Sequence, residues 1–436
     1  MVPAVAYEHA ADDWWKKPLI IGLAVCVVLY LALGGGGALD TGSAASRPAG
    51  GVARGGATRY GCMMDAGSTG SRIHIYRFAQ RLDGSLELED EVFKQLKPGV
   101  SSFAGEPHKA ALSIQPLLDE AFKTVPAAQR ATTPIALYAT AGLRLLPVPG
   151  QSDAILEELR GALAASPFQF DQKDVAITQG KLEGVFAWTT VNFLLGNLDA
   201  GSGSGSSGTA GIIDLGGGST QVVFEPAAGT RMDAIAHADT HAMMMGGKPH
   251  ELFAHSYLGY GLNSVAKKIR AAGPPGGKHP CYPVGHVSKA EGVDDVTGSG
   301  DAVGCATLIK QCVHSLEPEL GMKLVTSPPS AGAEFYVFSY FYDRLVEGYG
   351  LVANQPLSLD DIDAAAHVVC KLTVEEVSSK YPMAESAEKF CMDVSFCAVL
   401  LREGYGLTAA NRLTLAKKIN NVETAWTLGA MLDLLS

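Results

Sequence analysis

Two distant segments of this chain repeat one pattern, and this repetition constrains the fold more than any other feature. Residues 60–78 (YGCMMDAGSTGSRIHIYRF) and residues 211–225 (GIIDLGGGSTQVVFE) each run from an apolar strand into an aspartate, a loop of Gly, Ser and Thr, and a second β-rich strand. Each segment is predicted to be a hairpin with Asp65 or Asp214 at the end of its first strand. Two such hairpins, about 150 residues apart, indicate two related lobes that each supply one loop to a shared cleft.

The sequence around these hairpins is typical of an α/β protein. From Tyr60 onward, short apolar runs alternate with helical stretches. The 436 residues are enough for two or three domains of ordinary size. Residues 201–211 (GSGSGSSGTAG) have the composition of a flexible surface loop, and residues 273–300 are expected to form a long irregular insertion.

The N-terminus carries the clearest targeting signal. Residues 18–39 contain no charged residue and approach the length that a bilayer requires. Residues 1–17 end in two Trp and two Lys; aromatic residues prefer the membrane interface, and Lys favours the cytosolic side. We expect a cytosolic tail (1–17), a transmembrane signal anchor (18–39) and a polar stem (40–58), with the body in the lumen of the secretory pathway, on Golgi or related membranes. A cleaved signal peptide ending in the small residues 34–38 is the alternative, and it delivers the body to the same compartment.

Composition restricts both the partners and the redox chemistry. The formal net charge of −11 gives no electrostatic footprint for nucleic acid, so we exclude the nucleic-acid-binding class. The chain has eight cysteines without a CxxC pair, which argues against a zinc site and, in an oxidising lumen, favours disulfides. Spacing alone leaves their connectivity open. The expected pairs are Cys281–Cys305 and Cys370–Cys391, and Cys312 or Cys397 could replace a partner.

The loops of both hairpins suit phosphate groups. Glycine lets the backbone approach an anion closely, and successive backbone N–H groups form an anion-binding nest. The first loop also carries the fixed positive charge of Arg72. An ordinary Gly-rich turn is the simpler interpretation of one such loop, but two matched loops, each led by an aspartate, favour phosphate binding. The hydroxyl donors in the two loops are Ser68, Thr69, Ser71, Ser219 and Thr220.

The two aspartates are candidates for holding a metal ion. Mg²⁺ and Ca²⁺ prefer carboxylate oxygens and water as ligands. Asp65 and Asp214, one from each lobe, are expected to hold a hydrated ion between them, and such an ion would bridge phosphates and offset their charge. The alternative is that each aspartate caps its own turn, and the two roles can coexist.

Hydrolysis also requires a group that orients or deprotonates water. Glu183 falls at the predicted start of an apolar helix, after a strand and a Gln179–Gly180 turn. It is a candidate general base, but a carboxylate in a first helical turn also interacts favourably with the helix dipole, and the pattern alone leaves both roles open. In residues 135–146 (IALYATAGLRLL), Thr140 is a weaker candidate for orienting water, and Arg144 for contacting phosphate or bracing the cleft.

Five segments together resemble the nucleoside triphosphate diphosphohydrolases, or apyrases, and most of all their Golgi nucleoside diphosphatase branch. In chain order they are DAGSTGSRIHIYRF, ATAGLR, QGKLEGVFAWTTVNFLLG, DLGGGSTQVVFE and ETAWTLGAML, within residues 60–436. The resemblance implies two ribonuclease H-like lobes with a central cleft, as in actin and sugar kinases. It also implies removal of the terminal phosphate from nucleotides, with Ca²⁺ or Mg²⁺ as the cofactor.

The resemblance assigns roles to individual residues. Glu183 aligns with the base that activates water, and Asp65 and Asp214 align with the pair that holds the water shell of the metal. The other implied catalytic groups are Thr140, Ser219 and Gln221, which place the water, and Arg72. The implied phosphate-binding residues are Ser68, Thr69, Gly70, Ser71, His74, Arg144, Gly216, Gly217, Gly218 and Thr220. The candidates for contacting the nucleobase are Tyr340, from the aromatic run 335–342, and Trp426, from the fifth segment.

The branch of the family and the extent of each lobe are finer expectations. Lobe I is expected to span residues 59–200, completed by a C-terminal helix at about 420–436, and lobe II to span residues 201–419. The GGGST loop and the FYVFSYFYDR segment are similar to the Golgi enzymes, which act on the GDP and UDP left by glycosyltransferases. Because QGKLEG lacks the extra acidic residue often found before Glu-Gly, a broader apyrase that acts on ATP and ADP is the alternative.

Three other classes share parts of this pattern. A kinase or chaperone-type ATPase of the same superfold would also use paired phosphate loops, but the luminal address and the position of Glu183 favour hydrolysis. A non-catalytic nucleotide-binding protein would tolerate the loss of Glu183, whereas this chain retains every candidate catalytic group. An exopolyphosphatase-like enzyme would lack the aromatic residues for a nucleobase.

Overall fold

The computed structural model describes residues 57–82, 84–198, 208–227, 230, 237–273, 277–290, 293–314 and 334–436. The expected tail and anchor, nearly all of the expected stem and most of the glycine-rich tract at 201–211 lie outside the described residues. Residues 54–436 form one compact unit. Among the described residues, no helix combines the length and the apolar character needed to cross a bilayer.

Lobe I is built on a mixed five-stranded sheet. Its strands are β1 (Thr58–Ala66), β2 (Ser71–Gln80), β3 (Leu86–Leu96), β4 (Ile135–Ala139) and β5 (Val175–Ile177), in the order β3-β2-β1-β4-β5. The first repeated hairpin forms the centre, because β1 pairs antiparallel with β2 on one side and parallel with β4 on the other. The first residues of the edge strand β3 (LELE) alternate apolar and charged side chains, as expected where one face of a strand meets solvent.

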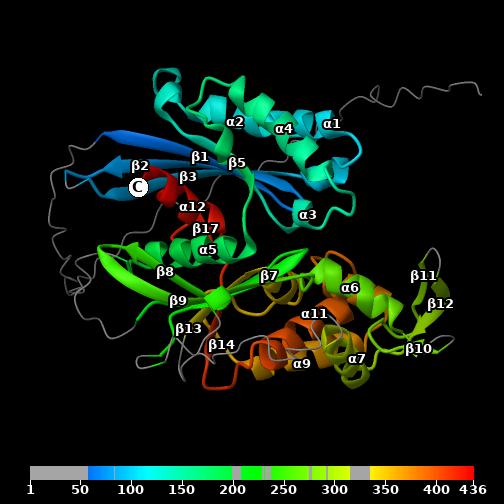
Figure 1. The fold of residues 1–436 in the computed structure, drawn as a ribbon. Coiled ribbons are helices and arrows are strands. Elements are labelled where there is room, and N and C mark those ends of the chain that lie inside the picture. Colours follow the sequence, from blue (N-terminus) through cyan, green and yellow to red (C-terminus); the bar gives the residue numbers. More distant parts are fainter. Residues whose placement is uncertain are drawn as a thin grey trace, which may run out of the picture. The chain divides into compact units, whose positions relative to one another are not determined.

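Helices bury the outer face of the lobe I sheet. They are α1 (Pro107–Ser113), α2 (Gln115–Thr124) and α4 (Gln151–Ala164), and they lie together on the outer side of the sheet (Figure 1). Apolar residues of α4 recur three or four positions apart, so that Ile155, Leu159 and Leu163 share the buried stripe. A short helix, α3 (Ala141–Arg144), follows β4 at the inner edge.

Lobe II repeats this plan on a larger scale. Its sheet has seven strands in the order β14-β15-β13-β6-β7-β9-β8. These strands are β6 (Gly211–Leu215), β7 (Ser219–Phe224), β8 (Thr240–Met245), β9 (Lys248–Leu258), β13 (Glu334–Ser339), β14 (Pro356–Leu357) and β15 (Arg412–Leu415). The second repeated hairpin, β6–β7, is again antiparallel, and β13 pairs parallel with β6 as β4 does with β1. The predicted repetition of one motif in two lobes is confirmed.

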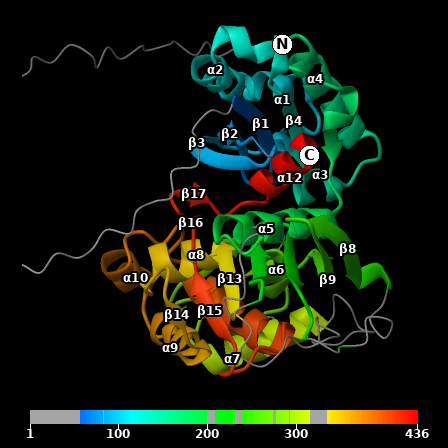
Figure 2. The ribbon, with the colours of Figure 1, turned by 90° about the vertical axis from the view of Figure 1, so that its left-hand side faces the viewer.

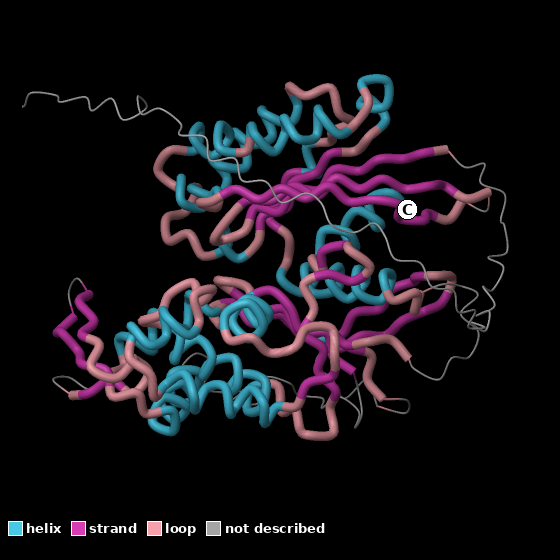
Figure 3. The backbone as a smooth tube through the Cα atoms, turned by 180° about the vertical axis from the view of Figure 1, so that it is seen from behind, coloured by secondary structure: helices cyan, strands magenta, loops and turns pink. Residues whose placement is uncertain are grey.

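Most helices of lobe II cover the outer face of its sheet, as the view from behind shows (Figure 3). They are α6 (Leu262–Ala271), α7 (Ala302–His314), α9 (Leu359–Cys370) and α11 (Phe390–Val399). Helix α10 (Val374–Lys380) and the small sheet of β10 (Lys278–His279), β11 (Val287–Ala290) and β12 (Val293–Gly298) lie at the periphery. The small sheet falls within the expected insertion at 273–300, so part of that segment is regular rather than irregular.

Two helices pack together in the region where the lobes meet (Figure 2). They are α5 (Gly180–Leu194) and the C-terminal helix α12 (Trp426–Leu435), which follows the short hairpin of β16 (Lys418–Ile419) and β17 (Val422–Glu423). The backbones of the two helices are in direct contact, because a Cβ atom on Gly429 would lie 2.0 Å from the carbonyl oxygen of Phe186. Helix α12 is also tied to lobe I, because the hydroxyls of Thr427 and Tyr76 are 2.9 Å apart. These contacts support the proposed assignment of the C-terminal helix to lobe I.

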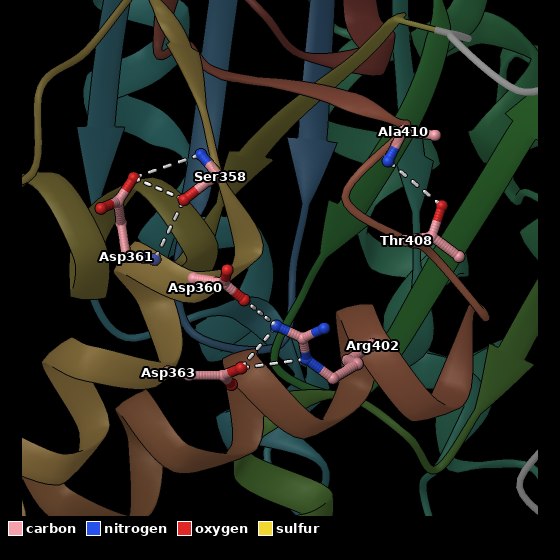
Figure 4. Close-up of polar contacts among 7 residues, drawn as sticks. All are labelled: Ser358, Asp360, Asp361, Asp363, Arg402, Thr408 and Ala410. Carbon is pink, nitrogen blue, oxygen red and sulfur yellow. Dashed lines mark hydrogen bonds and ion pairs between the residues drawn. The ribbon is translucent and has the colours of Figure 1, made fainter.

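Polar contacts lock α9 onto the end of the α11 segment in lobe II (Figure 4). The hydroxyl of Ser358 and the carboxylate of Asp361 form a capping box that begins α9. Arg402, in the π-helical turn Leu400–Gly404 that continues α11, donates from Nε and Nη2 to Asp363 over 2.9 and 2.6 Å, and from Nη2 to Asp360 over 2.8 Å. Such a fork–carboxylate contact carries directional specificity that a single ion pair lacks.

The structure joins Cys281 to Cys305 and Cys370 to Cys391, the two expected pairs. The second disulfide connects α9 to the start of α11, and its cysteines are 21 residues apart in the sequence. Closing a loop of that length lowers the conformational entropy of the unfolded chain, which stabilises the folded state by about 3 kcal/mol. We expect Cys370→Ser combined with Cys391→Ser to lower the free energy of unfolding by about 3 kcal/mol in a denaturant titration. A non-reducing peptide map that joins Cys370 to Cys397 would contradict this pairing.

Candidate active site

The two repeated loops face each other across a cleft of about 510 Å³. In the first loop the Gly67 N–H donates to the Gly70 carbonyl over 3.0 Å; in the second, the Gly216 N–H donates to the Ser219 carbonyl over 2.9 Å. The predicted site residues that line the cleft are Asp65, Ser68, Thr69, Arg72, His74, Thr140, Glu183, Asp214, Gly216, Gly217, Tyr340 and Trp426. The structure therefore brings the loops, both aspartates and Glu183 to one cavity.

Glycine is required where the loops approach most closely. A Cβ atom on Gly217 would lie 2.6 Å from the Ser68 hydroxyl and 3.3 Å from the Thr69 methyl carbon of the opposite loop. The second loop is also held from behind, because the first N–H groups of α6 donate to the carbonyls of Gly216 and Gly217 over 3.0 Å. The two loops thus approach each other so closely that a side chain at position 217 would collide with the opposite loop.

We expect Gly217→Ala to reduce kcat/KM for nucleotide at least about 10-fold, because the added methyl group displaces the Ser68 hydroxyl from the loop. The thermal midpoint should change little, since the new contacts are with side-chain ends rather than with backbone. The matched control is Gly161→Ala in α4, where a Cβ atom meets nothing within 4 Å. Equal activities of the two variants would contradict a role for the Gly217 loop in binding phosphate.

Asp65 and Asp214 present unpaired oxygens to the cleft. Both residues are buried, with 8% and 7% of their surface exposed. Arg72 donates from Nη1 to Oδ2 of Asp65 over 2.9 Å, and the Ser339 hydroxyl bonds to the Asp214 carboxylate. The Oδ1 atoms of both aspartates are buried and lack a hydrogen-bond partner among the described residues. Buried carboxylate oxygens without partners are costly unless a ligand satisfies them.

Burial raises the pKa of both aspartates, and that of Asp214 reaches about 6, with the nearby charge of Asp65 adding to the effect of burial. A divalent cation would satisfy the orphaned oxygens and reverse these shifts. The described residues contain no cluster of three or more His, Cys, Asp or Glu side chains that could enclose a metal. Two carboxylates fit a cation that keeps most of its water, as Mg²⁺ commonly does.

Glu183 lies in the first turn of α5, beside this carboxylate pair. Only 7% of its surface is exposed, and Arg144 donates from Nη2 to its Oε2 atom. Burial raises the pKa of Glu183 to about 8; the Arg144 guanidinium opposes this shift, and the charges of Asp214 and Asp65 add to it. A buried carboxylate with a raised pKa next to a cleft is a candidate acid–base group. Arg144 was expected to contact phosphate or to brace the cleft. In the structure it binds Glu183, and it is not among the residues that line the cleft.

The alternation of side chains along β7 separates three neighbouring candidates. Ser219 and Gln221 share one face of the strand, and the Gln221 amide nitrogen donates to the Ser219 hydroxyl over 2.8 Å. Thr220 points to the opposite face, where its hydroxyl lies 2.6 Å from both the Asp214 carbonyl oxygen and the Tyr405 hydroxyl. Because the Thr220 hydroxyl is fully buried in that core, the expectation that it binds phosphate is corrected.

Four other residues that were predicted to bind phosphate in the two loops lie in different surroundings. His74 lies within β2 rather than in the loop, and its Nδ1 atom is 2.7 Å from Glu91. Ser71 begins β2, and its buried hydroxyl lacks a described partner. Gly70 allows the close approach of the Leu96 carbonyl, which would lie 2.8 Å from a Cβ atom there. Gly218 lines a neighbouring pocket behind the loops.

The two aromatic candidates differ in how freely they face the cleft. Trp426, with 4% of its surface exposed, stacks on Tyr138 at a centroid distance of 6.1 Å. Tyr340 is partly exposed, and the Arg344 guanidinium lies 4.7 Å from its ring centroid. Trp426 therefore forms a cleft wall, whereas Tyr340 remains the better candidate for contacting a nucleobase.

Several further residues, not predicted from the sequence, line the same cleft, among them Gln95, Ser339, Asp343, Arg344, Met383, Glu385 and Lys417. Ser339 has a positive φ (57°), which is uncommon outside glycine, and such strained backbone conformations concentrate at functional sites. The sequence did hold a signal that could have found Ser339, because this residue directly follows an apolar run (FYVF). In the structure that run lies in β13, which pairs parallel with the strand of Asp214.

Comparisons with known proteins agree with this geometry. A model of the GDA1/CD39 (nucleoside phosphatase) family matches residues 53–436. Ectonucleoside triphosphate diphosphohydrolase 6 of Mus musculus is 38% identical over 408 residues, which cover 91% of this chain and 86% of that protein. A Homo sapiens nucleoside diphosphate phosphatase is 36% identical over 393 residues, covering 87% of this chain and 88% of that one.

Solved structures show the same fold at low sequence identity. A nucleoside triphosphate hydrolase from Neospora caninum matches with a TM-score of 0.61 and 13% identity, over 86% of this chain and 92% of that one. A Ppx/GppA family member from Aquifex aeolicus matches with a TM-score of 0.50 and 14% identity, over 87% of this chain and 98% of that one. The fold is thus the expected actin-like arrangement of mixed α/β lobes.

Proposed function

Because the chain belongs to the GDA1/CD39 family of nucleoside phosphatases, we propose that it removes the terminal phosphate from nucleoside diphosphates, with GDP and UDP as preferred substrates. Membership of this family makes it a nucleotide phosphohydrolase, and the similarity to a human nucleoside diphosphate phosphatase supports the diphosphatase assignment. In this proposal, water attacks the terminal phosphorus, and Glu183 accepts the proton of that water.

The observation that carries the proposal is the convergence of three buried carboxylates between two glycine loops. Asp65, Asp214 and Glu183 come from three elements, and burial raises the pKa of all three. The charge of Asp65 adds to the rise at Asp214, and the charges of both aspartates add to the rise at Glu183. Arg72 and Arg144 offset part of this negative charge, but the Oδ1 atoms of both aspartates have no partner among the described residues, and buried charge is costly unless it is paired. Ca²⁺ or Mg²⁺ between the two aspartates would supply that charge and offset the negative charge of the phosphate oxygens.

Each remaining residue has a role that its position supports. Backbone N–H groups and the hydroxyls of Ser68 and Thr69 surround the phosphates from one lobe, and Gly216 and Gly217 approach them from the other. Arg72 fixes the orientation of Asp65, and Arg144 fixes that of Glu183. Thr140, at the cleft end of β4, and the Ser219–Gln221 pair are proposed to place the attacking water.

The raised pKa of Glu183 predicts how activity depends on pH. A general base must be ionised, and a carboxyl with a pKa of about 8 is mostly protonated at pH 6. We therefore expect kcat/KM to rise with pH between about 6 and 8, with the midpoint moving to lower pH as the divalent cation concentration is raised. Initial rates across this window at two cation concentrations measure both effects. A profile that falls throughout the window would exclude Glu183 as the base.

The proposed substrate preference is tested with phosphate release from a panel of nucleotides. The purified full chain in detergent is supplied with Mg²⁺ or Ca²⁺ and with GDP, UDP, ADP and CDP, or the corresponding triphosphates. We expect GDP and UDP to have the highest kcat/KM. Faster hydrolysis of ATP and ADP would replace the diphosphatase by a broad-specificity apyrase, and release from none of them would refute the function.

We also propose that residues 18–39 anchor the chain as a single-pass type II membrane protein whose body lies in the lumen of the Golgi or a related compartment. The support is the uncharged span and the two Lys that precede it. In sealed microsomes, an added protease should spare residues 59–436 until detergent opens the vesicles. Digestion of the body in intact vesicles would contradict this orientation.

A further inference from the structure

Three polar side chains stand in a row across the lobe II sheet. Asp214 of β6 is the direct cross-strand partner of Gln221 in β7, and Gln221 is the direct partner of Ser256 in β9. Directly opposed residues place their side chains on the same face of a sheet. Ser256 therefore belongs to the row that begins at the proposed metal ligand, although the resemblance gives Ser256 no role.

Ser256 holds the Gln221 carboxamide. The amide nitrogen of Gln221 donates to the Ser256 hydroxyl over 2.9 Å and to the Ser219 hydroxyl over 2.8 Å. A carboxamide nitrogen has two hydrogens, and the two serine oxygens account for both. The carbonyl oxygen of Gln221 is consequently turned to the other side of the amide, where it can accept a hydrogen bond but cannot donate one.

The same hydroxyl lies against the start of the helix that carries Glu183. A Cβ atom on Gly180 would come within 2.2 Å of Ser256 Oγ and 2.6 Å of Arg144 Nη1. One turn on, a Cβ atom on Gly184 would lie 3.1 Å from the Cβ atom of Gln221. Gln221 thus packs beside the residue that follows Glu183, and Ser256 lies between Gln221 and the Arg144–Glu183 ion pair.

We propose that Ser256 is a positioning residue of the hydrolytic reaction, which acts by fixing the orientation of the Gln221 carboxamide next to Glu183. The attacking water must give a proton to Glu183 and direct a lone pair at phosphorus. The carbonyl oxygen of Gln221 accepts a hydrogen bond from the second hydrogen of that water, so only one orientation of the water is favoured. Without Ser256, only the hydrogen bond to Ser219 opposes rotation of the amide, and a rotated amide would present its N–H group and compete for the lone pair. This inference rests on the function proposed above.

The test is a double-mutant cycle on kcat for GDP in the presence of Mg²⁺. We expect Ser256→Ala to lower kcat about 10-fold with KM changed less than about twofold, because positioning affects the chemical step rather than binding. In a Gln221→Ala background, Ser256→Ala should cost less than about twofold, since the residue through which it acts is already gone. Ser378→Ala, a serine in the exposed part of α10, is the matched control for the substitution itself.

A second variant, in helix α5, disturbs the same Ser256 hydroxyl. Gly180→Ala improves the intrinsic helix propensity of α5 but drives a methyl group against Ser256 Oγ. We expect it to lower kcat at least as much as Ser256→Ala, because the methyl group also meets Arg144 Nη1, while the thermal midpoint stays within a few degrees. The Gly161→Ala variant serves as its control.

The outcomes separate the inference from the function on which it rests. Full kcat in Ser256→Ala, or an equal loss in the wild-type and Gln221→Ala backgrounds, overturns the positioning role while leaving the hydrolase intact. A wild-type protein that releases no phosphate from any nucleotide overturns the proposed function itself. A loss confined to the background that retains Gln221 supports the inference.

Discussion

Replacing Glu183 by Gln is expected to reduce kcat at least about 100-fold, the scale of losing general-base assistance. The substitution keeps the size of the side chain but removes the group that accepts the proton of water. Nucleotide and cation binding should persist, because the loops and the two aspartates are untouched. Initial rates of phosphate release and a calorimetric titration with GDP and Mg²⁺ measure the two properties separately.

A matched control makes this result specific. Glu157→Gln makes the same chemical change on the exposed side of α4, where the carboxylate pairs with Arg160, one turn away on the same helix. Its turnover should equal that of the unmodified protein. Turnover within a few-fold of normal in Glu183→Gln would refute the assignment of the base, and loss of nucleotide binding would show that Glu183 holds the site together instead.

Removing either cleft aspartate is the second large expected effect. Asp65→Asn and Asp214→Asn should each lower kcat/KM by about 100-fold or more, since each removes half of the charge that retains the cation. The double variant should lose little beyond either single change, because the two residues act on one ion. The concentration of Mg²⁺ at half-maximal activity should rise sharply in both single variants.

Excess chelator provides the complementary measurement. The unmodified protein should lose its activity in chelator and regain it when Mg²⁺ or Ca²⁺ is added, whereas the Asn variants should regain little at the same cation concentration. Asp119→Asn, on the exposed surface of α2, is the control and should follow the unmodified protein. Undiminished hydrolysis in chelator would exclude the role given to Asp65 and Asp214.

The repeated hairpins explain why so much of the site was predictable from local pattern. In each, an apolar strand, an aspartate and a glycine loop lie within a few residues of one another, so the local sequence places the loop and the carboxylate together. The same alternation that defines a strand would also have excluded Thr220. Ser219 and Gln221 share a face in any β-strand, and Thr220 must take the opposite one.

Other features depend on register and packing that no local pattern contains. The Ser256–Gln221 contact, between residues 35 apart in the sequence, arises from the pairing of β7 with β9. The contact of Arg144 with Glu183 joins two separate segments of lobe I, and the stacking of Trp426 on Tyr138 joins the C-terminus to β4. Such contacts follow from the assembled sheets and helices and not from the residues' own neighbourhoods.

We propose that Asp65 and Asp214 together hold one hydrated divalent cation where the two loops meet. Titration with Mn²⁺, followed by electron paramagnetic resonance in the presence of a non-hydrolysable GDP analogue, counts that ion directly. The structure predicts one bound Mn²⁺ per chain in the unmodified protein and in Glu183→Gln, and weakened or lost binding in Asp65→Asn and in Asp214→Asn. Unchanged Mn²⁺ binding in both aspartate variants would contradict it.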